Sequence, residues 1–374
     1  MILELYCPTR AIDALVVTCV TDDRGPIRVT AHLDAAALPG RAMHPPVAIG
    51  RGRGYHFLFD GLAPRRILDI RAQDAAGRVH HLKAATLDPP PGPRLARIGV
   101  VADAHLTDDT PDTYRLYRHT AELLEHALTR LADAGCDAVV ALGDLTDQGT
   151  DDQLARAKSL FQACRVPVHP IIGNHEYVPE RFLKAFGLDR GYRAIDIGDA
   201  RLALLHTHSP SSLAPRSRQV RWLAATLDRE PDRPTAVFSH YQLADHAYLA
   251  RETSRTVMNH RAIAEMLAAR PGVLAAFAGH RNIPARTEVD GVTHAVCAQP
   301  CQAPCGFDIV DVYATGVVRQ TLEIHRLDLL HRSRRALGTS KGPAHYRYGV
   351  ERARNFVATR EPAPRKRIPL AAAR

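Results

Sequence analysis

The pattern of apolar and polar residues changes character along the chain. Residues 14–20 and 27–33 alternate like strands on either side of a turn, and a second pair of such runs covers 67–72 and 79–84. Apart from a short stretch at 34–38, no helical period accompanies them. We therefore predict an all-β domain over residues 1–87.

A run of prolines separates this segment from the rest of the chain. Asp88-Pro89-Pro90-Pro91-Gly92-Pro93 continues neither a helix nor a central strand, so residues 88–94 are predicted to be a stiff linker. Over 95–326 buried strands and amphipathic helices alternate, which indicates an α/β sheet with helices outside it. Strands are expected at 98–102, 138–142, 166–172, 202–205, 236–238 and 273–278, and helices at 112–134, after Thr150, at 219–227 and near 262–269.

Acids, amides and histidines follow five of the predicted strands. Because the carboxyl ends of parallel strands face one crevice, these side chains are expected to converge. Carboxylates, imidazoles and amide oxygens are ligands of divalent Mn, Fe and Zn. The strand-end sequences are Ala102-Asp103-Ala104-His105, Gly143-Asp144, Gly173-Asn174-His175-Glu176, Ser239-His240 and Gly279-His280-Arg281-Asn282.

This ordered series resembles that of the calcineurin-like metallophosphoesterase superfamily. The resemblance implies a four-layer α/β/β/α sandwich with two divalent metal ions (Mn, Fe or Zn) at its edge. It also implies hydrolysis of phosphodiesters or phosphomonoesters by a water or hydroxide that the two ions activate. By matching position, Asp103 and His105 would hold the first ion, and Asp144 would bridge both. Asn174, His240 and His280 would complete the second site.

The same resemblance suggests roles for two neighbours and reveals one departure. His175 would contact the phosphate and act with Asp144 in catalysis, and Glu176 would orient His175. The family's last signature is Gly-His-x-His, whereas here Asn282 takes the final place, where an amide oxygen is a weaker ligand of the first ion. His206, His208, Tyr241 and Arg281 are candidate substrate contacts.

The motifs also indicate the branch. Asp103-x-His105 and Gly-Asn-His-Glu are similar to the bacterial cyclic-nucleotide phosphodiesterase branch. Purple acid phosphatases carry a tyrosine where this chain has Asp147, so a purple Fe(III) enzyme is not expected. In the N-terminal segment, Gly61-Leu62-Ala63-Pro64 followed by 68–72 resembles the second half of a fibronectin-type-III sandwich.

The net charge of +9 is concentrated at the C-terminal end of the chain. Residues 326–374 carry 13 Lys or Arg and three acids, so the remainder sums to −1. We expect residues 327–374 to be a basic, solvated extension. Its charge raises the alternative of a nuclease, which the near-neutral body does not favour. A non-catalytic scaffold with a degraded metal site is another alternative, and homo-oligomerisation is left open.

The number of cysteines and the length of the apolar runs indicate the cellular location of the protein. The seven cysteines are odd in number and scattered, as in reduced intracellular proteins. No run approaches the roughly 18 uncharged apolar residues of a membrane span, and the first residues do not read as a signal peptide. We therefore expect a cytoplasmic protein that acts on a small phosphate ester.

Overall fold

The computed structural model describes residues 1–22, 25–33, 36–107, 110–249, 256–340, 349 and 351–360. The first part of the chain is all strand. Its elements are β1 (Ile2–Arg10), β2 (Leu15–Thr21), β3 (Arg28–Leu33), β4 (Ala36–Pro39), β5 (Arg41–Ala42), β6 (Val47–Ile49), β7 (Gly52–Phe59), β8 (Ile67–Gln73) and β9 (Val79–Ala85).

These strands form two antiparallel sheets that enclose one core. One sheet has the order β1-β2-β7-β5, with β6 also paired to β7, and the other has the order β4-β3-β8-β9. Alternate residues such as Val17, Ala31 and Ile70 point inward and are buried together. The short helical period at 34–38 does not mark a helix in its described part, because Ala36–Pro39 is strand β4; residues 34 and 35 lie outside the described residues. The fibronectin-type-III likeness and the boundary at 88–94 stay predictions.

After an irregular Pro-rich stretch the chain alternates between strands and helices, as expected. The strands are β10 (Ala96–Val101), β11 (Ala138–Leu142), β12 (Val168–Ile171), β13 (Arg193–Ile197), β14 (Ala200–Leu204), β15 (Thr235–Ser239), β16 (Val273–Ala278), β17 (Ala285–Val289), β18 (Val292–Val296), β19 (Gly306–Tyr313), β20 (Gly316–Glu323) and β21 (Phe356–Thr359). The helices are η1 (Tyr117–His119), α1 (Thr120–Asp133), α2 (Asp151–Ala163), α3 (Pro179–Phe186), η2 (Pro210–Leu213), α4 (Arg218–Arg229), η3 (Ala247–Leu249), α5 (His260–Ala268), α6 (Leu327–Ser340) and α8 (Glu351–Arg354).

The helix predicted over 112–134 is shorter than expected. Its first turn is the 3₁₀ helix η1, and the regular α-helix begins at Thr120. The apolar stripe of Leu123, Leu124, Leu128 and Leu131 is buried, as the periodicity indicated.

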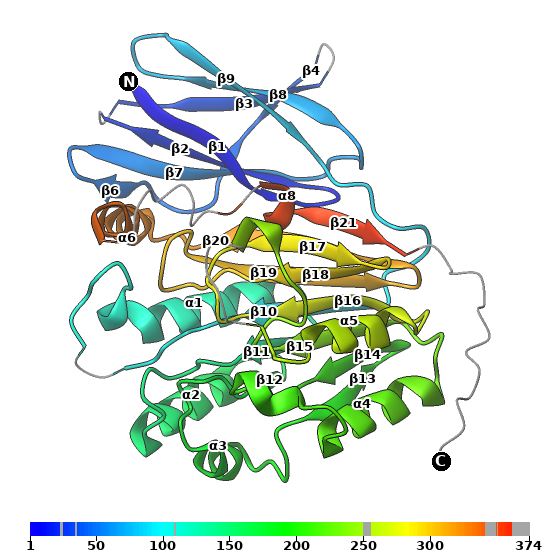
Figure 1. The fold of residues 1–374 in the computed structure, drawn as a ribbon. Helices are drawn as coiled ribbons and strands as arrows, with labels where there is room; N and C mark the ends of the chain where they lie inside the picture. The colour runs from blue at the N-terminus through cyan, green and yellow to red at the C-terminus, as the bar shows by residue number, and fades with distance from the viewer. Residues whose placement is uncertain are drawn as a thin grey trace.

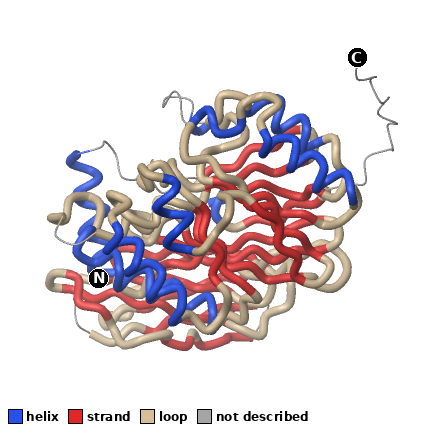
Figure 2. The backbone as a smooth tube through the Cα atoms, turned by 90° about the horizontal axis from the view of Figure 1, so that it is seen from below, coloured by secondary structure: helices blue, strands red, loops and turns tan. Residues whose placement is uncertain are grey.

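Two six-stranded sheets lie face to face between the helices (Figures 1 and 2). One has the order β12-β11-β10-β19-β20-β21 and the other β13-β14-β15-β16-β18-β17. Ile98, Val140, Leu202 and Phe277 belong to the apolar layer that fills the space between them. Helices α1 and α2 pack on the outer face of the first sheet, and α4 and α5 on the outer face of the second. The arrangement is the predicted helix–sheet–sheet–helix order.

The direction of the strands brings the polar loops of both sheets to one edge of the sandwich. Strands β10, β11 and β12 run parallel, and so do β14, β15 and β16. Their carboxyl ends, which carry the polar loops, therefore lie at the same edge.

The expectation of a solvated extension from residue 327 is wrong for much of that segment. Leu327, Leu330 and Leu337 of α6 are buried in the core, and β21 adds a strand beside β20. Apolar positions at helical and strand spacing decide this placement, although the surrounding residues are basic. The basic end at 361–374 lies outside the described residues.

A buried ion pair ties the sheets to this C-terminal segment. Arg319 on β20 donates to Asp308 on β19 at 2.9 Å, and neither side chain is exposed. The same guanidinium donates to the carbonyls of Val296 in the other sheet and Ala353 in α8, at 3.0 and 3.1 Å. Removing one partner of such a pair leaves an uncompensated buried charge.

We expect Arg319→Met to lower the free energy of unfolding by about 3–5 kcal/mol, because Asp308 would stay buried without its cation. The double variant Arg319→Met/Asp308→Leu should recover most of that loss. Urea unfolding followed by circular dichroism measures both. A single variant as stable as the wild type would contradict this role.

Candidate metal centre

Five of the predicted ligands lie in backbone conformations that L-residues rarely adopt. The φ angles are 52° for Asp103, 48° for His105, 46° for Asp144, 68° for His280 and 60° for Asn282. Such left-handed conformations cost of order 1–3 kcal/mol each and persist where the surroundings hold them. The backbone N–H of His280, for example, donates to both oxygens of Asp103, at 3.0 and 2.9 Å.

Glycines let two of the loops touch. A Cβ at Gly173 would lie 2.1 Å from the backbone nitrogen of Asp144 and 2.3 Å from its Oδ1. Gly143 has φ 79°, and a Cβ there would lie 2.7 Å from the nitrogen of Gly173. A side chain at either position would clash with the other loop. The close approach of the loops after β11 and β12 therefore requires glycine at both strand ends.

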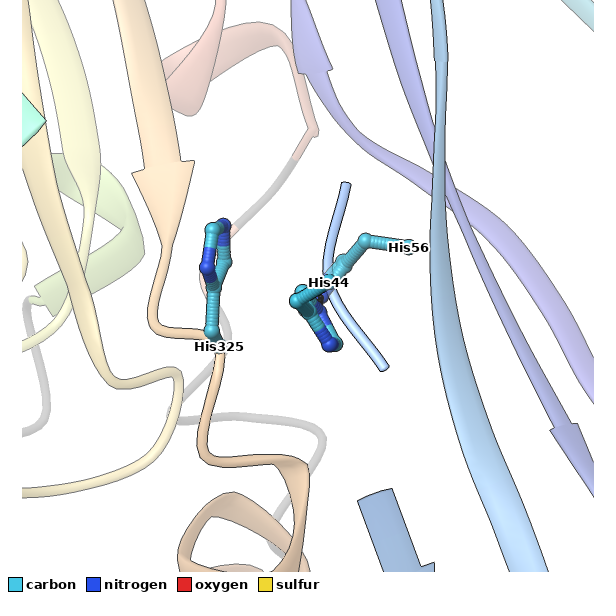
Figure 3. A group of neighbouring side chains, drawn as sticks. All are labelled: His44, His56 and His325. Atoms are coloured by element: carbon cyan, nitrogen blue, oxygen red, sulfur yellow. Dashed lines mark hydrogen bonds between the residues drawn. The ribbon is translucent and has the colours of Figure 1, made fainter. Parts of the chain in front are cut away.

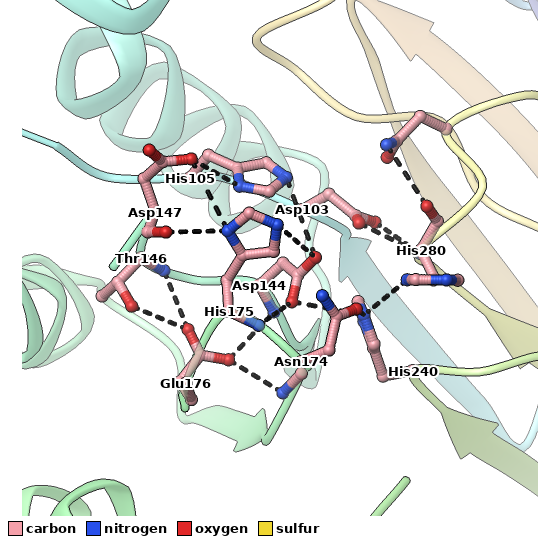
Figure 4. Close-up of polar contacts among 12 residues, drawn as sticks. Asp103, His105, Asp144, Thr146, Asp147, Asn174, His175, Glu176, His240 and His280 are labelled. Atoms are coloured by element: carbon pink, nitrogen blue, oxygen red, sulfur yellow. Dashed lines mark hydrogen bonds and ion pairs between the residues drawn. The ribbon is translucent and has the colours of Figure 1, made fainter. Parts of the chain in front are cut away.

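Asp144 lies at the middle of the cluster (Figure 4). Its Oδ1 is 3.3 Å from Nε2 of His240, and it accepts the backbone N–H of His175 at 2.9 Å. Its Oδ2 faces the other way, 3.9 Å from Nε2 of His105 and 4.0 Å from Nε2 of His175. The two carboxylate oxygens thus face different groups of side chains.

The strand-end side chains fall into two groups that share Asp144. Ligand atoms of Asp103, His105 and Asp144 lie within 4.8 Å of one another, and so do those of Asp144, His240 and His280. In the second group Asn174 Oδ1 lies 3.0 Å from His240 Nε2, and His280 Nδ1 lies 3.2 Å from the same atom. The structure therefore brings the residues of all five strand ends together.

Neighbouring groups orient the histidine rings. Nδ1 of His240 donates to the carbonyl of Leu142 at 2.8 Å, and Nδ1 of His175 donates to the carbonyl of Asp147 at 2.7 Å. Nδ1 of His105 lies 3.3 Å from Asp147 Oδ1. Each ring then presents Nε2 to the cluster, which is how metal-ligating histidines are held.

Burial and mutual attraction push the pKa values in this cluster apart. Burial raises the pKa of Asp103 to about 7, although His240 opposes that change. Burial would raise the pKa of Asp144 as well, but the nearby His240 and His105 outweigh it and lower that pKa. Burial lowers the pKa of His105 to about 4, and Arg115 adds to this. The pKa of His240 rises to about 9, because attraction to Asp144 exceeds the effect of burial.

The donor set fits divalent metal ions. Carboxylate oxygens, imidazole nitrogens and amide oxygens are ligands that Mn, Fe and Zn share. The Nε2 atom of His105 is buried and has no hydrogen-bond partner among the described residues. The side-chain amide of Asn282 lies beside the Asp103 carboxylate, and in the orientation that satisfies both groups its nitrogen donates to the two carboxylate oxygens at 3.2 and 3.3 Å.

Glu176 differs from the sequence expectation. Its carboxylate does not orient the His175 ring but accepts from the backbone of two strand-end loops. The donors are Gly173 N at 2.8 Å, Asp144 N at 3.1 Å, and both N and Oγ1 of Thr146 at 3.0 and 2.8 Å.

The candidate substrate contacts separate into two groups. Tyr241 stacks on His280, with 4.1 Å between ring centroids. Arg281, which follows His280 in the sequence, is buried. His206 and His208 contact each other, with centroids 4.7 Å apart, and His208 also lies 3.3 Å from Ser212. Within the described part of the chain, the hydrogen bonds and ring contacts of these two histidines do not reach the cluster.

Three supporting residues were not predicted. Asp147 contacts His105 and His175, Arg115 lies 3.8 Å from Asp147, and Thr207 accepts the backbone N–H groups of His240 and Tyr241 at 2.8 and 3.0 Å. Asp147 lies in the same loop as Asp144, so its spacing from Asp144 is a local sequence pattern that could have indicated its supporting role. Arg115 comes from a distant loop, so no local pattern indicates it.

Comparison with known proteins agrees with this geometry. The family model for calcineurin-like phosphoesterases matches residues 96–284. The 3′,5′-cyclic adenosine monophosphate phosphodiesterase CpdA of Haemophilus influenzae is 26% identical over 200 residues, which are 50% of this chain and 70% of that protein. The glycerophosphodiester phosphodiesterase GpdQ of Enterobacter lignolyticus is 29% identical over 159 residues, 39% of this chain and 56% of that protein.

A solved structure supports the fold. A dimetal phosphatase from Danio rerio superposes with a TM-score of 0.51 at 21% identity, covering 62% of this chain and 98% of that one. No helix among the described residues is both long and apolar enough to cross a membrane. Half of the chain matches the family model, and the strand-end ligands from Asp103 to Asn282 all lie within that half. The chain therefore belongs to the calcineurin-like phosphoesterase family, and it is a metal-dependent hydrolase of phosphoesters.

Proposed function

We propose that this protein hydrolyses small phosphodiesters at a binuclear metal centre. Asp103, His105 and Asp144, with Asn282, would hold the first ion. Asp144, Asn174, His240 and His280 would hold the second. The observation that carries the proposal is that the two oxygens of Asp144 face different ligand groups, as a bridging carboxylate requires.

The residues present supply complementary functions. Two divalent ions at such a centre lower the pKa of a bound water and stabilise the oxygens of an in-line displacement. His175 is 26% exposed, and its Nδ1 is held by the carbonyl of Asp147. When doubly protonated, it can donate from Nε2 to a phosphate oxygen or to the leaving group.

The choice of a diester rests on the relatives. Both curated relatives are named as phosphodiesterases, one for a cyclic nucleotide and one for glycerophosphodiesters. The nuclease alternative rests on the basic segment 327–374. Its described residues include α6 and β21, which pack against the body of the protein, and 361–374 lie outside the described residues, so the structure adds no support to this alternative. The scaffold alternative rests on Asn282, whose side-chain amide still lies beside the Asp103 carboxylate.

We expect Mn-dependent hydrolysis of bis(p-nitrophenyl) phosphate by the wild type. Asp144→Asn should lower kcat/KM by about 10³-fold or more, because metal ions supply several kcal/mol of transition-state stabilisation. Asp199→Asn, in an exposed turn, is the matched control and should leave the rate unchanged. A wild type that binds metal but hydrolyses only phosphomonoesters would contradict the proposed substrate class.

His175→Gln separates proton transfer from metal binding. We expect kcat to fall by about 10²-fold or more, while the metal content per chain stays at the wild-type value. Steady-state kinetics and elemental analysis of the same preparation give both quantities. Loss of metal together with activity would show that His175 is a ligand instead.

Glu176→Gln tests the positioning of the Asp144 loop. The amide replaces one accepting oxygen with a donor that faces N–H groups, so we expect metal affinity to fall about 10–100-fold. Glu180→Gln, at an exposed position of α3, is the control. Metal titration of the folded variants measures the effect, and an unchanged affinity would argue against this role.

A further inference from the structure

Three histidines from distant parts of the chain meet where the N-terminal strands contact β20. His44 lies in the loop before β6, His56 lies on β7 and His325 follows β20 (Figure 3). One nitrogen from each lies within 4.8 Å of the others. We propose that His44, His56 and His325 form a further metal site, for a borderline divalent cation such as Zn²⁺, that links the N-terminal strands to the catalytic sheet.

The hydrogen bonds of two rings favour a cation between them. Nδ1 of His44 lies 2.7 Å from the carbonyl of Pro45, and Nε2 of His56 lies 2.9 Å from a carboxylate oxygen of Glu323. Both acceptors require an N–H, so in the neutral rings the remaining nitrogens carry lone pairs. Those nitrogens, Nε2 of His44 and Nδ1 of His56, face each other at 2.7 Å. Two lone pairs at this distance repel unless a proton or a metal ion lies between them.

Protonation of the His44 ring is the less favourable way to relieve this repulsion. Burial lowers the pKa of His44, and the nearby His56 and Arg130 add to this, while the Pro45 carbonyl opposes it in part. A metal ion, by contrast, binds the neutral imidazole. Imidazole nitrogens suit Zn, Cu, Ni and Fe better than Mg or Ca, so the donor set selects a borderline cation.

Glu323 supports the site in the manner of known metal-bound histidines. Besides His56, its carboxylate accepts from the hydroxyl groups of Tyr6 at 3.1 Å and Thr18 at 3.0 Å. The carboxylate is thus fixed from three sides, and it orients the His56 ring. A carboxylate behind a ligating histidine is the usual arrangement at zinc sites.

The third proposed ligand, His325, also contacts an arginine side chain. The ring of His325 lies 4.4 Å from that of His44 and 5.5 Å from that of His56, measured between centroids. The guanidinium of Arg130 on α1 contacts Nε2 of His325. His56 is buried, but His44 is half-buried beside the exposed Pro45 and Pro46, so an ion can enter from that side.

Zinc stoichiometry tests the proposal. The full-length protein is stripped with a chelator, reloaded with Zn²⁺, desalted and analysed for metal per chain. We expect His44→Ala and, independently, His325→Gln to hold one zinc fewer per chain than the wild type. Both should retain Mn-dependent phosphodiesterase activity, because the strand-end cluster is intact.

Two controls distinguish ligand loss from local damage. His80→Ala removes a histidine from β9, outside the cluster, and should keep the wild-type zinc content. Arg130→Gln removes the partner of His325 but leaves all three ligands, so it should also keep the zinc. Equal zinc in wild type and His44→Ala would overturn the proposal, and so would an equal loss in Arg130→Gln. Because the readout is metal content, these results are independent of whether the protein is a phosphodiesterase.

Discussion

The structure depends on holding several charged and polar side chains close together away from water. Asp103 and Asp144 are both buried, and burial favours the neutral form of each carboxyl, whereas the adjacent histidines favour the charged form of Asp144. A divalent cation suits such a cluster, because it compensates the negative charge of the carboxylates and binds imidazoles in their neutral form. The opposite pKa changes of His105 and His240 reflect the same conflict within one cluster.

The fold meets this constraint through its strand ends. Parallel strands in two stacked sheets deliver the loops to one edge, and the glycines at 143 and 173 let two of those loops come into contact. The left-handed residues then aim their side chains at a common centre. Backbone strain at such positions is tolerated because Glu176, Thr207 and the strand hydrogen bonds hold the loops in place.

Much of this arrangement could be predicted from the sequence, because each group of ligands lies just after a predicted strand. The same local signal could not identify Arg115 or the Arg319–Asp308 pair, whose members meet only through tertiary packing. The prediction of a solvated segment after residue 327 is wrong because it follows the net charge of these residues, whereas their apolar positions place α6 and β21 in the fold. The His44, His56 and His325 group was missed for the related reason that its members lie on unrelated elements.

The central claim is that the strand-end loops build a centre for two metal ions that share Asp144. Anomalous X-ray diffraction from crystals reconstituted with Mn²⁺ tests it most directly. We expect two peaks about 3.5–4 Å apart, one on each side of the Asp144 carboxylate. A single peak, or two peaks that do not share Asp144, would contradict it.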